Sequence, residues 1–467
     1  MKPVPLPPDF LAALANLLPP ADLLTEASDC WTYGYDNSKR HAPPEAVAFP
    51  REHDQIVSLV CLCNEFHIPI TPRGRGTGTT GATVPTHGGL VLSLERMDKI
   101  LRVDPDNRLL VAQPGATNLA VQQAAAAHGF FWPPDPTSAA VCTIGGNLAY
   151  NSAGPRAVKY GTPRENTLGL RAVTGDGRSI RTGVMTTKGV VGYDLTRLII
   201  GSEGTLAIIT EAVLKLTPKP AAKRTLQAVY ADLDSAARAI AAIMAQPVVP
   251  CALEFIDGSA IEMIRSHSRA ELPQGAGALL MIEVDGPPTS LEEAVGEIMR
   301  AAKVSGCLSV KIATTQAEVE ALWATRKALS PALRTIAPKK INEDVVVPVS
   351  RIPALIEGLQ ALGRRHEITI VNFGHAGNGN IHVNLLIDPD DPRQAAAAEH
   401  CLQEVFELVL RLEGTLSGEH GVGLVKRDYV ALEIDAATLT LMRGIKHQFD
   451  PLGLLNADKA LPPAAIT

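Results

Sequence analysis

The residue types best suited to chemistry lie in two short glycine-rich segments in the second half of the chain. Residues 372–384 read NFGHAGNGNIHVN and include His375 and His382. Residues 417–423 read SGEHGVG and place Glu419 next to His420. Two imidazoles and one carboxylate form a ligand set for a divalent metal that leaves coordination positions open for a substrate and for solvent. The two segments predict a metal site if the fold brings them together.

Local sequence signals predict the element that would position the two histidines. Apolar runs flank a GNGN sequence, which is typical of a β-hairpin turn. A turn at Asn378 and Gly379 would bring His375 and His382 close together on facing strands. The glycines of residues 417–423 free the backbone to present adjacent side chains toward one site. The alternative is that the spacing of two of the 12 histidines is a coincidence.

Glycine-rich segments also occur three times in the first half of the chain, at residues 72–81 (PRGRGTGTTG), 143–155 (TIGGNLAYNSAGP) and 201–206 (GSEGTL). The first contains GxGxxG, but no Lys follows its last glycine as a P-loop requires. Pro85 and Gly88 break the helix that a nicotinamide-type Rossmann turn would open. What remains is a loop of uncovered backbone amides beside Arg73 and Arg75, which suits a pyrophosphate, or else an ordinary mobile surface loop. Together the three segments favour a long nucleotide cofactor held mainly by backbone groups.

The surrounding pattern predicts two different textures along the chain. Up to about Leu216, short strands at residues 91–94 and 109–113 alternate with loops rich in Gly and Pro, and a helix follows Thr117 and ends at Gly129. From about Lys219, strand-like runs alternate with helical ones, with strands expected at residues 225–230, 253–256 and 278–284. Ser290 and Glu293 predict a capping box. The segment Pro218 to Pro220 is the expected linker.

Composition excludes several classes of protein. The chain has 467 residues, 46% of them hydrophobic, with 43 Lys and Arg against 49 Asp and Glu, a net charge of −6 that argues against a nucleic-acid binder. No apolar run reaches the roughly 18 residues of a membrane-spanning helix. The proline-rich start resembles neither a signal nor a transit peptide, so we expect a cytoplasmic location. The seven cysteines are scattered and form no CxxC pair, which argues against a disulfide scaffold or an iron–sulfur cluster.

The glycine segments resemble those of a known flavoprotein superfamily. The sequence RGRGT at residues 73–77, residues 143–154, KGVVGYD at 188–194 and GSEGTL at 201–206 are similar to the FAD domain of the vanillyl-alcohol oxidase/p-cresol methylhydroxylase superfamily. This resemblance implies an α+β fold: a two-part FAD-binding domain of the p-cresol methylhydroxylase type at residues 1–218, then an α/β substrate or cap domain with an antiparallel sheet at 219–425. Residues 426–467 would form a C-terminal helical segment that returns to the FAD domain.

The same resemblance implies that FAD is bound in an elongated pose. Relatives with covalently attached flavin often carry His in the first loop, where this chain has Thr77, so we expect non-covalent FAD. The residues implied to contact FAD are Arg73, Gly74, Arg75, Gly76, Thr77, Gly78, Pro136, Thr137, Thr143, Gly145, Gly146, Asn147, Asn151, Ser152, Gly154, Glu203, Gly204 and Ile208.

The second half resembles the C-terminal part of FAD-dependent D-2-hydroxyacid dehydrogenases, which carry HxGDGNxH and SGEHGxG. Two departures are visible: Asn378 replaces the usual Asp of the turn, and residues 455–459 read LNADK where LNPGK is usual. The resemblance implies that His375, His382 and Glu419 hold Zn or Mn and that His420 is the general base. It also implies that Arg326 clamps the substrate carboxylate, with Ser330 and Asn384 as further substrate contacts. Arg326 could instead be a solvated helix charge, and we interpret Glu343 and Asp344 as structural.

The expected reaction is oxidation of a D-2-hydroxy acid, D-lactate or D-2-hydroxyglutarate, to the 2-oxo acid. Electrons would pass to a quinone, a cytochrome or an electron-transfer flavoprotein. Peripheral attachment to a membrane through that acceptor stays open. A homodimer stays open as well. A second substrate carboxylate would need another cation, for which Arg334, Lys339 and Lys340 are candidates. Two alternatives remain: an alcohol or phenol oxidase of the same superfamily, and a glycolate oxidase-type flavoprotein subunit that works within a larger electron-transfer complex.

Overall fold

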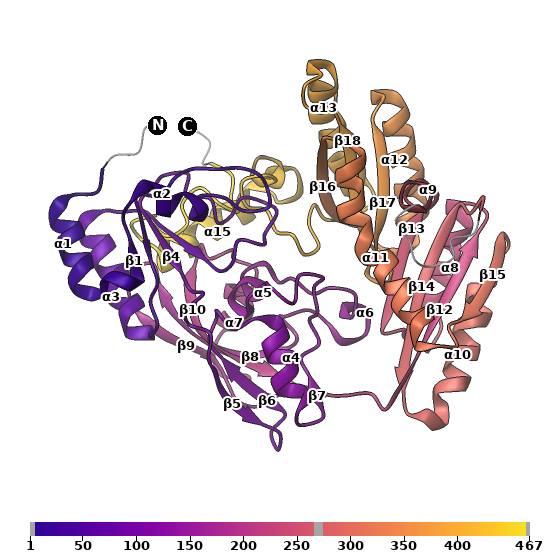
Figure 1. Ribbon diagram of the computed structural model, residues 1–467, viewed down its shortest axis with the longest axis horizontal. Coiled ribbons are helices and arrows are strands. Elements are labelled where there is room, and N and C mark those ends of the chain that lie inside the picture. The colour runs from indigo at the N-terminus through magenta and orange to yellow at the C-terminus, as the bar shows by residue number, and fades with distance from the viewer. Residues whose placement is uncertain (1–4, 266–273, 464–467) are drawn as a thin grey trace. The chain divides into compact units, whose positions relative to one another are not determined.

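The computed structural model describes residues 5–265 and 274–463 and divides the chain into two compact units (Figure 1). Unit 1 consists of Met1–Ala153, Gly161–Lys219 and Glu419–Thr467, and unit 2 of Gly154–Tyr160 and Pro220–Gly418. The chain therefore enters unit 2 within the expected proline segment.

The structure differs from the expected boundaries in two places. The short helix α6 (Ala157–Tyr160) belongs to unit 2, because the Tyr160 hydroxyl donates to Asp285 Oδ2 at 2.8 Å and Lys159 Nζ donates to the Asp285 carbonyl at 3.0 Å. The chain returns to unit 1 at Glu419, ahead of residue 426. The reason is that the amides just after it, at Val422 and Gly423, already bind a side chain of unit 1.

Unit 1 contains two main sheets. In the first, the strand order is β1-β2-β4-β3, and β2 and β3 both run parallel to β4. Helices α1 and α3 bury Phe10, Leu14, Ile56 and Leu59 in the core that contains Leu90 of β4. The elements are α1 (Pro8–Leu17), β1 (Leu23–Leu24), α2 (Ala27–Cys30), β2 (Ala46–Ala48), α3 (His53–Phe66), β3 (Ile70–Arg73) and β4 (Leu90–Ser93).

The second sheet of unit 1 is antiparallel, in the order β5-β6-β10-β8-β9. Its core joins Ile144 and Leu148 of α5 and Ile199 of α7 to Leu170 and Ile209 of the sheet, so the second and third glycine segments are anchored on it. The remaining helices and strands of unit 1, inside and outside this sheet, are β5 (Ile100–Asp104), β6 (Leu109–Ala112), α4 (Asn118–Ala126), β7 (Phe130–Phe131), α5 (Ile144–Tyr150), β8 (Thr167–Thr174), β9 (Ser179–Gly183), α7 (Leu195–Ile199), β10 (Ala207–Lys215), β11 (Thr217–Pro218), α14 (Val430–Glu433) and α15 (Ala436–Phe449).

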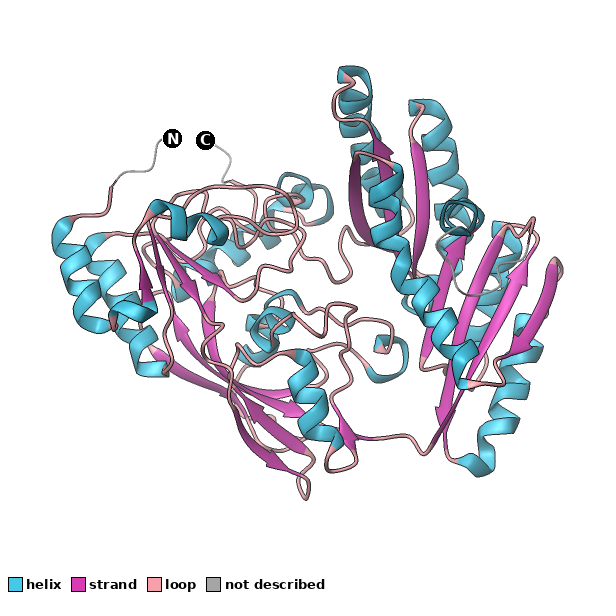
Figure 2. Ribbon diagram, in the orientation of Figure 1, coloured by secondary structure: helices cyan, strands magenta, loops and turns pink. Residues whose placement is uncertain are grey.

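Unit 2 is built on a seven-stranded antiparallel sheet in the order β15-β12-β14-β13-β17-β18-β16. Every residue of β13 and β18 is buried, so both faces of the sheet are covered, and Figure 2 shows helices on both sides of it. The strands are β12 (Ala222–Tyr230), β13 (Ala252–Asp257), β14 (Ala278–Gly286), β15 (Cys307–Ile312), β16 (Lys339–Val346), β17 (Thr369–His375) and β18 (Asn380–Ile387).

Helices α9 and α11 share one core cluster with this sheet: Ile261, Leu329 and Leu333 pack with Val371 and Phe373 of β17. Because side chains two residues apart in a strand share a face, His375 of β17 also lies on the face that α9 and α11 cover. The helices of unit 2 besides α6 are α8 (Leu233–Ala245), α9 (Gly258–Ile264), α10 (Pro288–Ala302), α11 (Gln316–Ile336), α12 (Ile352–His366) and α13 (Pro392–Arg411).

Most local predictions agree with these elements, with two corrections. The helix after Thr117 is α4, and the Thr117 hydroxyl accepts a hydrogen bond from the Ala120 amide. The expected capping box at Ser290 is wrong, because Pro288 starts α10 earlier and places Ser290 inside the helix. Helix α3 was not expected, although Glu52 and Gln55 form a capping box at its start. Among the described residues, no helix combines the length and the apolar composition needed to cross a membrane.

Candidate active site

The histidine segment forms the predicted hairpin. Strands β17 and β18 pair antiparallel with His375 opposite Asn380 and Phe373 opposite His382, so the two histidines are diagonal neighbours on one face. The ring centroids of His375 and His382 lie 5.2 Å apart, and both residues are buried. Gly379 closes the turn with φ of +75°, a conformation that favours glycine.

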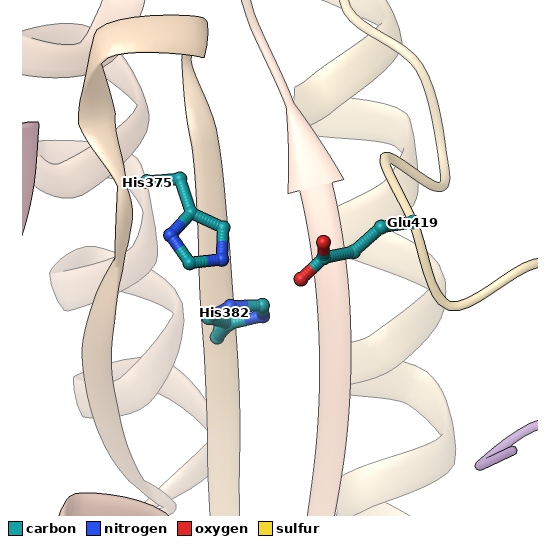
Figure 3. A group of neighbouring side chains, drawn as sticks. All are labelled: His375, His382 and Glu419. Carbon is teal, nitrogen blue, oxygen red and sulfur yellow. The ribbon is translucent and has the colours of Figure 1, made fainter. Parts of the chain in front are cut away.

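Glu419 completes a group of three potential metal ligands. The chain before it is held to β16, because the Ser417 hydroxyl donates to Asp344 Oδ1 at 3.1 Å and the Gly418 amide donates to Asp344 Oδ2 at 3.0 Å. Asp344 is the residue opposite His382 in the sheet. One ligand atom each from His375, His382 and Glu419 lies within 4.8 Å of the others, and Figure 3 shows the carboxylate directed toward the rings.

The donor set fits a divalent cation. Two imidazoles and one carboxylate are ligands that Zn²⁺ and Mn²⁺ share, and three protein ligands leave room for a substrate or water in the coordination shell. The sequence-predicted group is thus brought together from a hairpin and a following loop. Asp344, which we interpreted as structural, holds that loop in place.

Glu254 is the residue beside this group that the sequence analysis missed. It lies on β13 directly opposite His375, and it is 1% exposed. His375 Nδ1 donates to Glu254 Oε1 at 2.6 Å, and Arg326 Nε donates to Glu254 Oε2 at 2.6 Å. Burial by itself would raise the pKa of the Glu254 carboxyl, but the nearby His375 and Arg326 hold it below its usual value. A lone Glu in an apolar strand, LEFI, was the available signal.

Arg326 is buried in α11 and is not a solvated helix charge. It is 5% exposed, its guanidinium carbon lies 4.9 Å from the centroid of the Phe373 ring, and its Nε binds Glu254. One turn earlier on the same helix, Trp323 Nε1 donates to Glu283 Oε1 at 2.8 Å. Helix α11 is therefore docked onto the sheet by two carboxylates of neighbouring strands.

The other expected substrate contacts have protein partners. The Ser330 hydroxyl accepts from Lys340 Nζ at 2.6 Å. Asn384 is fully buried, and its amide nitrogen donates to the carbonyls of Val371 and His382 at 3.1 and 3.0 Å. The side chain of Arg334 lies outside the part of the chain that the structure describes.

A cavity that is open to solvent lies within unit 1, where the three glycine segments meet. Eight of the residues expected to contact FAD line it: Arg73, Gly74, Thr143, Gly145, Gly146, Glu203, Gly204 and Ile208. Ala149 and Tyr150 of α5, which were not expected, line it as well. The other expected residues lie outside the cavity lining: Arg75, Gly76, Thr77, Gly78, Pro136, Thr137, Asn147, Asn151, Ser152 and Gly154.

Close approach of glycine backbone to neighbouring side chains forms part of the cavity wall. A Cβ at position 74 would lie 2.5 Å from Thr143 Oγ1, and one at position 145 would lie 2.7 Å from Pro114 Cβ. Arg73 turns under the first loop, where its Nη1 donates to the Tyr35 carbonyl at 2.7 Å. A wall of glycine backbone and mainly apolar side chains fits an elongated nucleotide such as FAD.

Several expected FAD contacts serve unit 1 itself. Asn147 Oδ1 accepts from Asn118 Nδ2 at 3.1 Å, and Asn151 Oδ1 accepts from the Arg164 amide at 3.1 Å. The Ser152 hydroxyl donates to the Glu419 carbonyl at 3.1 Å. These side chains therefore fix the loop that follows α5 and the start of the SGEHGVG segment.

Glu203 links this cavity to the segment that contains His420. It is buried, and its two carboxylate oxygens accept from the amides of Val422 and Gly423 at 2.6 and 2.7 Å. Burial raises the pKa of Glu203 to about 7, although these amides and the nearby Lys426 and Lys459 oppose the shift. His420 itself is half-buried, and its carbonyl accepts from the Thr80 hydroxyl at 3.4 Å.

The geometry agrees with two family assignments. Residues 44–183 match the family described as FAD binding domain, and residues 219–460 match FAD linked oxidases, C-terminal domain. The chain is 40% identical to the glycolate oxidase subunit GlcD of Bacillus subtilis, and the match covers 91% of each chain. The chain belongs to the FAD-linked oxidase family. A D-2-hydroxyglutarate dehydrogenase of Xanthomonas citri is also similar, at 35% identity over 96% of each chain.

The fold of this FAD-linked oxidase agrees with the expected class. The solved structure of p-cresol methylhydroxylase with substrate bound matches it with a TM-score of 0.79 over 96% of this chain and 95% of that one. At 17% identity this match shows the fold alone. The p-cresol methylhydroxylase type of fold expected from the sequence is thereby confirmed.

We expect Gly74→Val to abolish retention of FAD, because the added side chain would overlap Thr143 in the cavity wall. The ratio of flavin to protein absorbance after purification measures the retained FAD. Gly444→Val in α15 is the control, since a Cβ there meets no atom within 4 Å. Equal flavin content in both variants would contradict the assignment of the cavity to FAD.

The raised pKa of Glu203 predicts a pH dependence of the apoprotein. The folded state holds the proton up to about pH 7, whereas the unfolded chain loses it near 4.5. This contribution to stability is therefore present below pH 4.5 and is lost as the pH rises through 7. We expect Glu203→Gln to remove that part of the decline, measured as the urea midpoint between pH 5 and about 8. If the urea midpoint of Glu203→Gln falls with pH as steeply as that of the wild type, the stabilising role of the Glu203 proton is refuted.

Proposed function

We propose that this FAD-linked oxidase converts a D-2-hydroxy acid, with D-lactate and D-2-hydroxyglutarate as the leading candidates, to the 2-oxo acid. The observation that carries the proposal is the group formed by His375, His382 and Glu419. An alcohol or phenol oxidase needs no metal chelation, whereas a 2-hydroxy acid offers a hydroxyl and a carboxylate oxygen to one cation. The names of the relatives from Bacillus subtilis and Xanthomonas citri support this class of substrate.

Each side chain then has a role that follows from its chemistry. His375, His382 and Glu419 would hold Zn²⁺ or Mn²⁺, which supplies a Lewis acid that lowers the pKa of the substrate hydroxyl. Arg326 would bind the substrate carboxylate through its planar guanidinium. His420, next to Glu419 in the chain, would accept the hydroxyl proton as general base. Asn384 and Ser330 would bind the substrate through the polar atoms that their hydrogen bonds within the protein leave available.

The proposal also covers the path of the electrons that leave the substrate. Bound, non-covalent FAD supplies the two-electron acceptor for the C2 hydride, so the substrate loses one hydride and one proton. A separate acceptor of the quinone, cytochrome or electron-transfer flavoprotein type would reoxidise the flavin. We propose that the protein lies in the cytoplasm and contacts a membrane only through that acceptor.

A second candidate is a glycolate oxidase-type flavoprotein subunit that acts within a larger complex. It is favoured by the 40% identity to the GlcD subunit, which covers 91% of that chain. Glycolate is itself a 2-hydroxy acid, so the ligand group around His375 would serve either candidate. The two differ in whether the isolated chain turns over.

Turnover of the purified holoprotein against D- and L-2-hydroxy acids and glycolate tests the proposal, with an artificial dye as electron acceptor. We expect activity with a D-2-hydroxy acid, loss of activity on treatment with a chelator, and recovery with Zn²⁺ or Mn²⁺. Activity that survives complete removal of metal would refute the metal-assisted mechanism. Activity with glycolate that appears only after addition of other subunits would favour the second candidate.

We expect His420→Ala to lower kcat by at least about a hundredfold, since a positioned general base contributes on the order of 10² to 10⁴ in rate. The flavin absorbance spectrum should stay intact, because the side chain of His420 does not line the FAD cavity. His400→Ala, at an exposed position of α13, is the matched control. Near-normal turnover of His420→Ala would refute its assignment as base.

A further inference from the structure

The buried carboxylate of Glu254 contacts two side chains to which the proposed function gives separate tasks. We propose that Glu254 is a positioning residue that orients the metal ligand His375 and the carboxylate-binding Arg326 at the same time. The inference rests on the proposed function for the tasks of those two side chains. The contacts themselves lie within unit 2.

The bond between Glu254 and His375 selects one form of the imidazole. An ionised carboxylate only accepts hydrogen bonds, so the 2.6 Å contact requires the hydrogen of the neutral ring to sit on Nδ1. The lone pair of that ring is then on Nε2, which makes Nε2 the nitrogen able to ligate a cation. Antiparallel pairing places Glu254 directly opposite His375, so this orientation is built into the register of β13 and β17. Carboxylates that bind metal-ligating histidines in this way raise the basicity of the ligand.

The bond between Glu254 and Arg326 fixes the plane of the guanidinium. It uses Nε, so Glu254 does not consume the Nη hydrogens of the same group, which remain as donors for a planar carboxylate. Contact with the ring of Phe373 at 4.9 Å restricts the same plane from another side. Both groups lie on the sheet face covered by α11, within reach of a single carboxylate.

Glu283 provides an internal comparison for Glu254. It is also buried, at 5% exposure, and also docks α11, through Trp323. Its further partners are the Thr225 hydroxyl at 3.0 Å and Lys223 Nζ at 2.8 Å, and within the described part of the chain it hydrogen-bonds to neither His375 nor Arg326. A carboxylate that serves only to dock α11 should therefore behave like Glu283.

The test measures metal affinity independently of turnover. Holoprotein freed of metal is titrated with Zn²⁺ in competition with a chromophoric chelator, for the wild type, Glu254→Gln, Glu283→Gln and His375→Ala. Loss of a carboxylate that orients a ligating histidine typically weakens metal binding about 10- to 100-fold, which we expect for Glu254→Gln. We expect Glu283→Gln to stay within about twofold of the wild type, since its partners hold no metal ligand.

A second measurement addresses Arg326. At saturating Zn²⁺, oxalate is titrated and its binding is followed by the change in flavin absorbance. We expect Glu254→Gln to weaken oxalate binding about tenfold, the loss of one hydrogen bond between charged groups, and Glu283→Gln to leave it unchanged. If Glu254→Gln does not fold because Arg326 is left uncompensated, Glu254→Gln combined with Arg326→Gln is compared with Arg326→Gln alone for Zn²⁺ affinity.

The outcomes separate this inference from the proposed function. Wild-type Zn²⁺ affinity in Glu254→Gln, or equal losses in Glu254→Gln and Glu283→Gln, would overturn the positioning role while the metal site stands. A wild type that binds no Zn²⁺, or a His375→Ala variant that binds it equally well, would overturn the proposed function and this inference together. A selective loss in Glu254→Gln, absent in Glu283→Gln, supports it.

Discussion

The register of the antiparallel sheet in unit 2 is the constraint on which the candidate site depends. Residues that lie opposite each other in neighbouring strands point to the same face, so Glu254 meets His375 and Asp344 meets His382. A slip of one residue in any of these pairs would turn one partner to the other face. The full burial of β13, beside the hairpin, and of β18, within it, makes such a slip costly, because it would also turn apolar side chains out of their cores.

Burial makes the charged side chains of this face depend on one another. Glu254, Arg326 and Asp344 are each at most 5% exposed, and a buried charge left without its partner costs about 3–5 kcal/mol. The shared carboxylate of Glu254 compensates Arg326 and binds His375, so the charge that stabilises the fold also orients the groups intended for chemistry. The polar face therefore stays rigid without exposure to water, which is what a preorganised site requires.

In unit 1 the main feature is a cavity that depends on glycine residues. Its cavity is shaped by glycines whose neighbours leave no room for a Cβ, as at positions 74, 145 and 204. Side chains near it, such as Arg73 and Asn147, mostly bind the protein's own backbone or amides. Glycine backbone thus shapes the cavity of unit 1, whereas unit 2 contributes the buried side chains of His375, His382 and Arg326. Glu203 belongs to the wall but also holds the amides of Val422 and Gly423, close in sequence to His420.

The sequence by itself determined the features that depend on near neighbours. The GNGN turn, the helix after Thr117 and the glycine segments follow from backbone preferences, and the motifs around His375 and Glu419 identified the family and the ligand group. The tertiary structure alone decided which distant residues meet. Glu254 lies 121 positions from His375, and its own segment marks it only as a lone Glu in an apolar strand. Only strand pairing and the docking of α11 bring it to His375 and Arg326, because register across a sheet is set by the packing of whole strands and not by local preference.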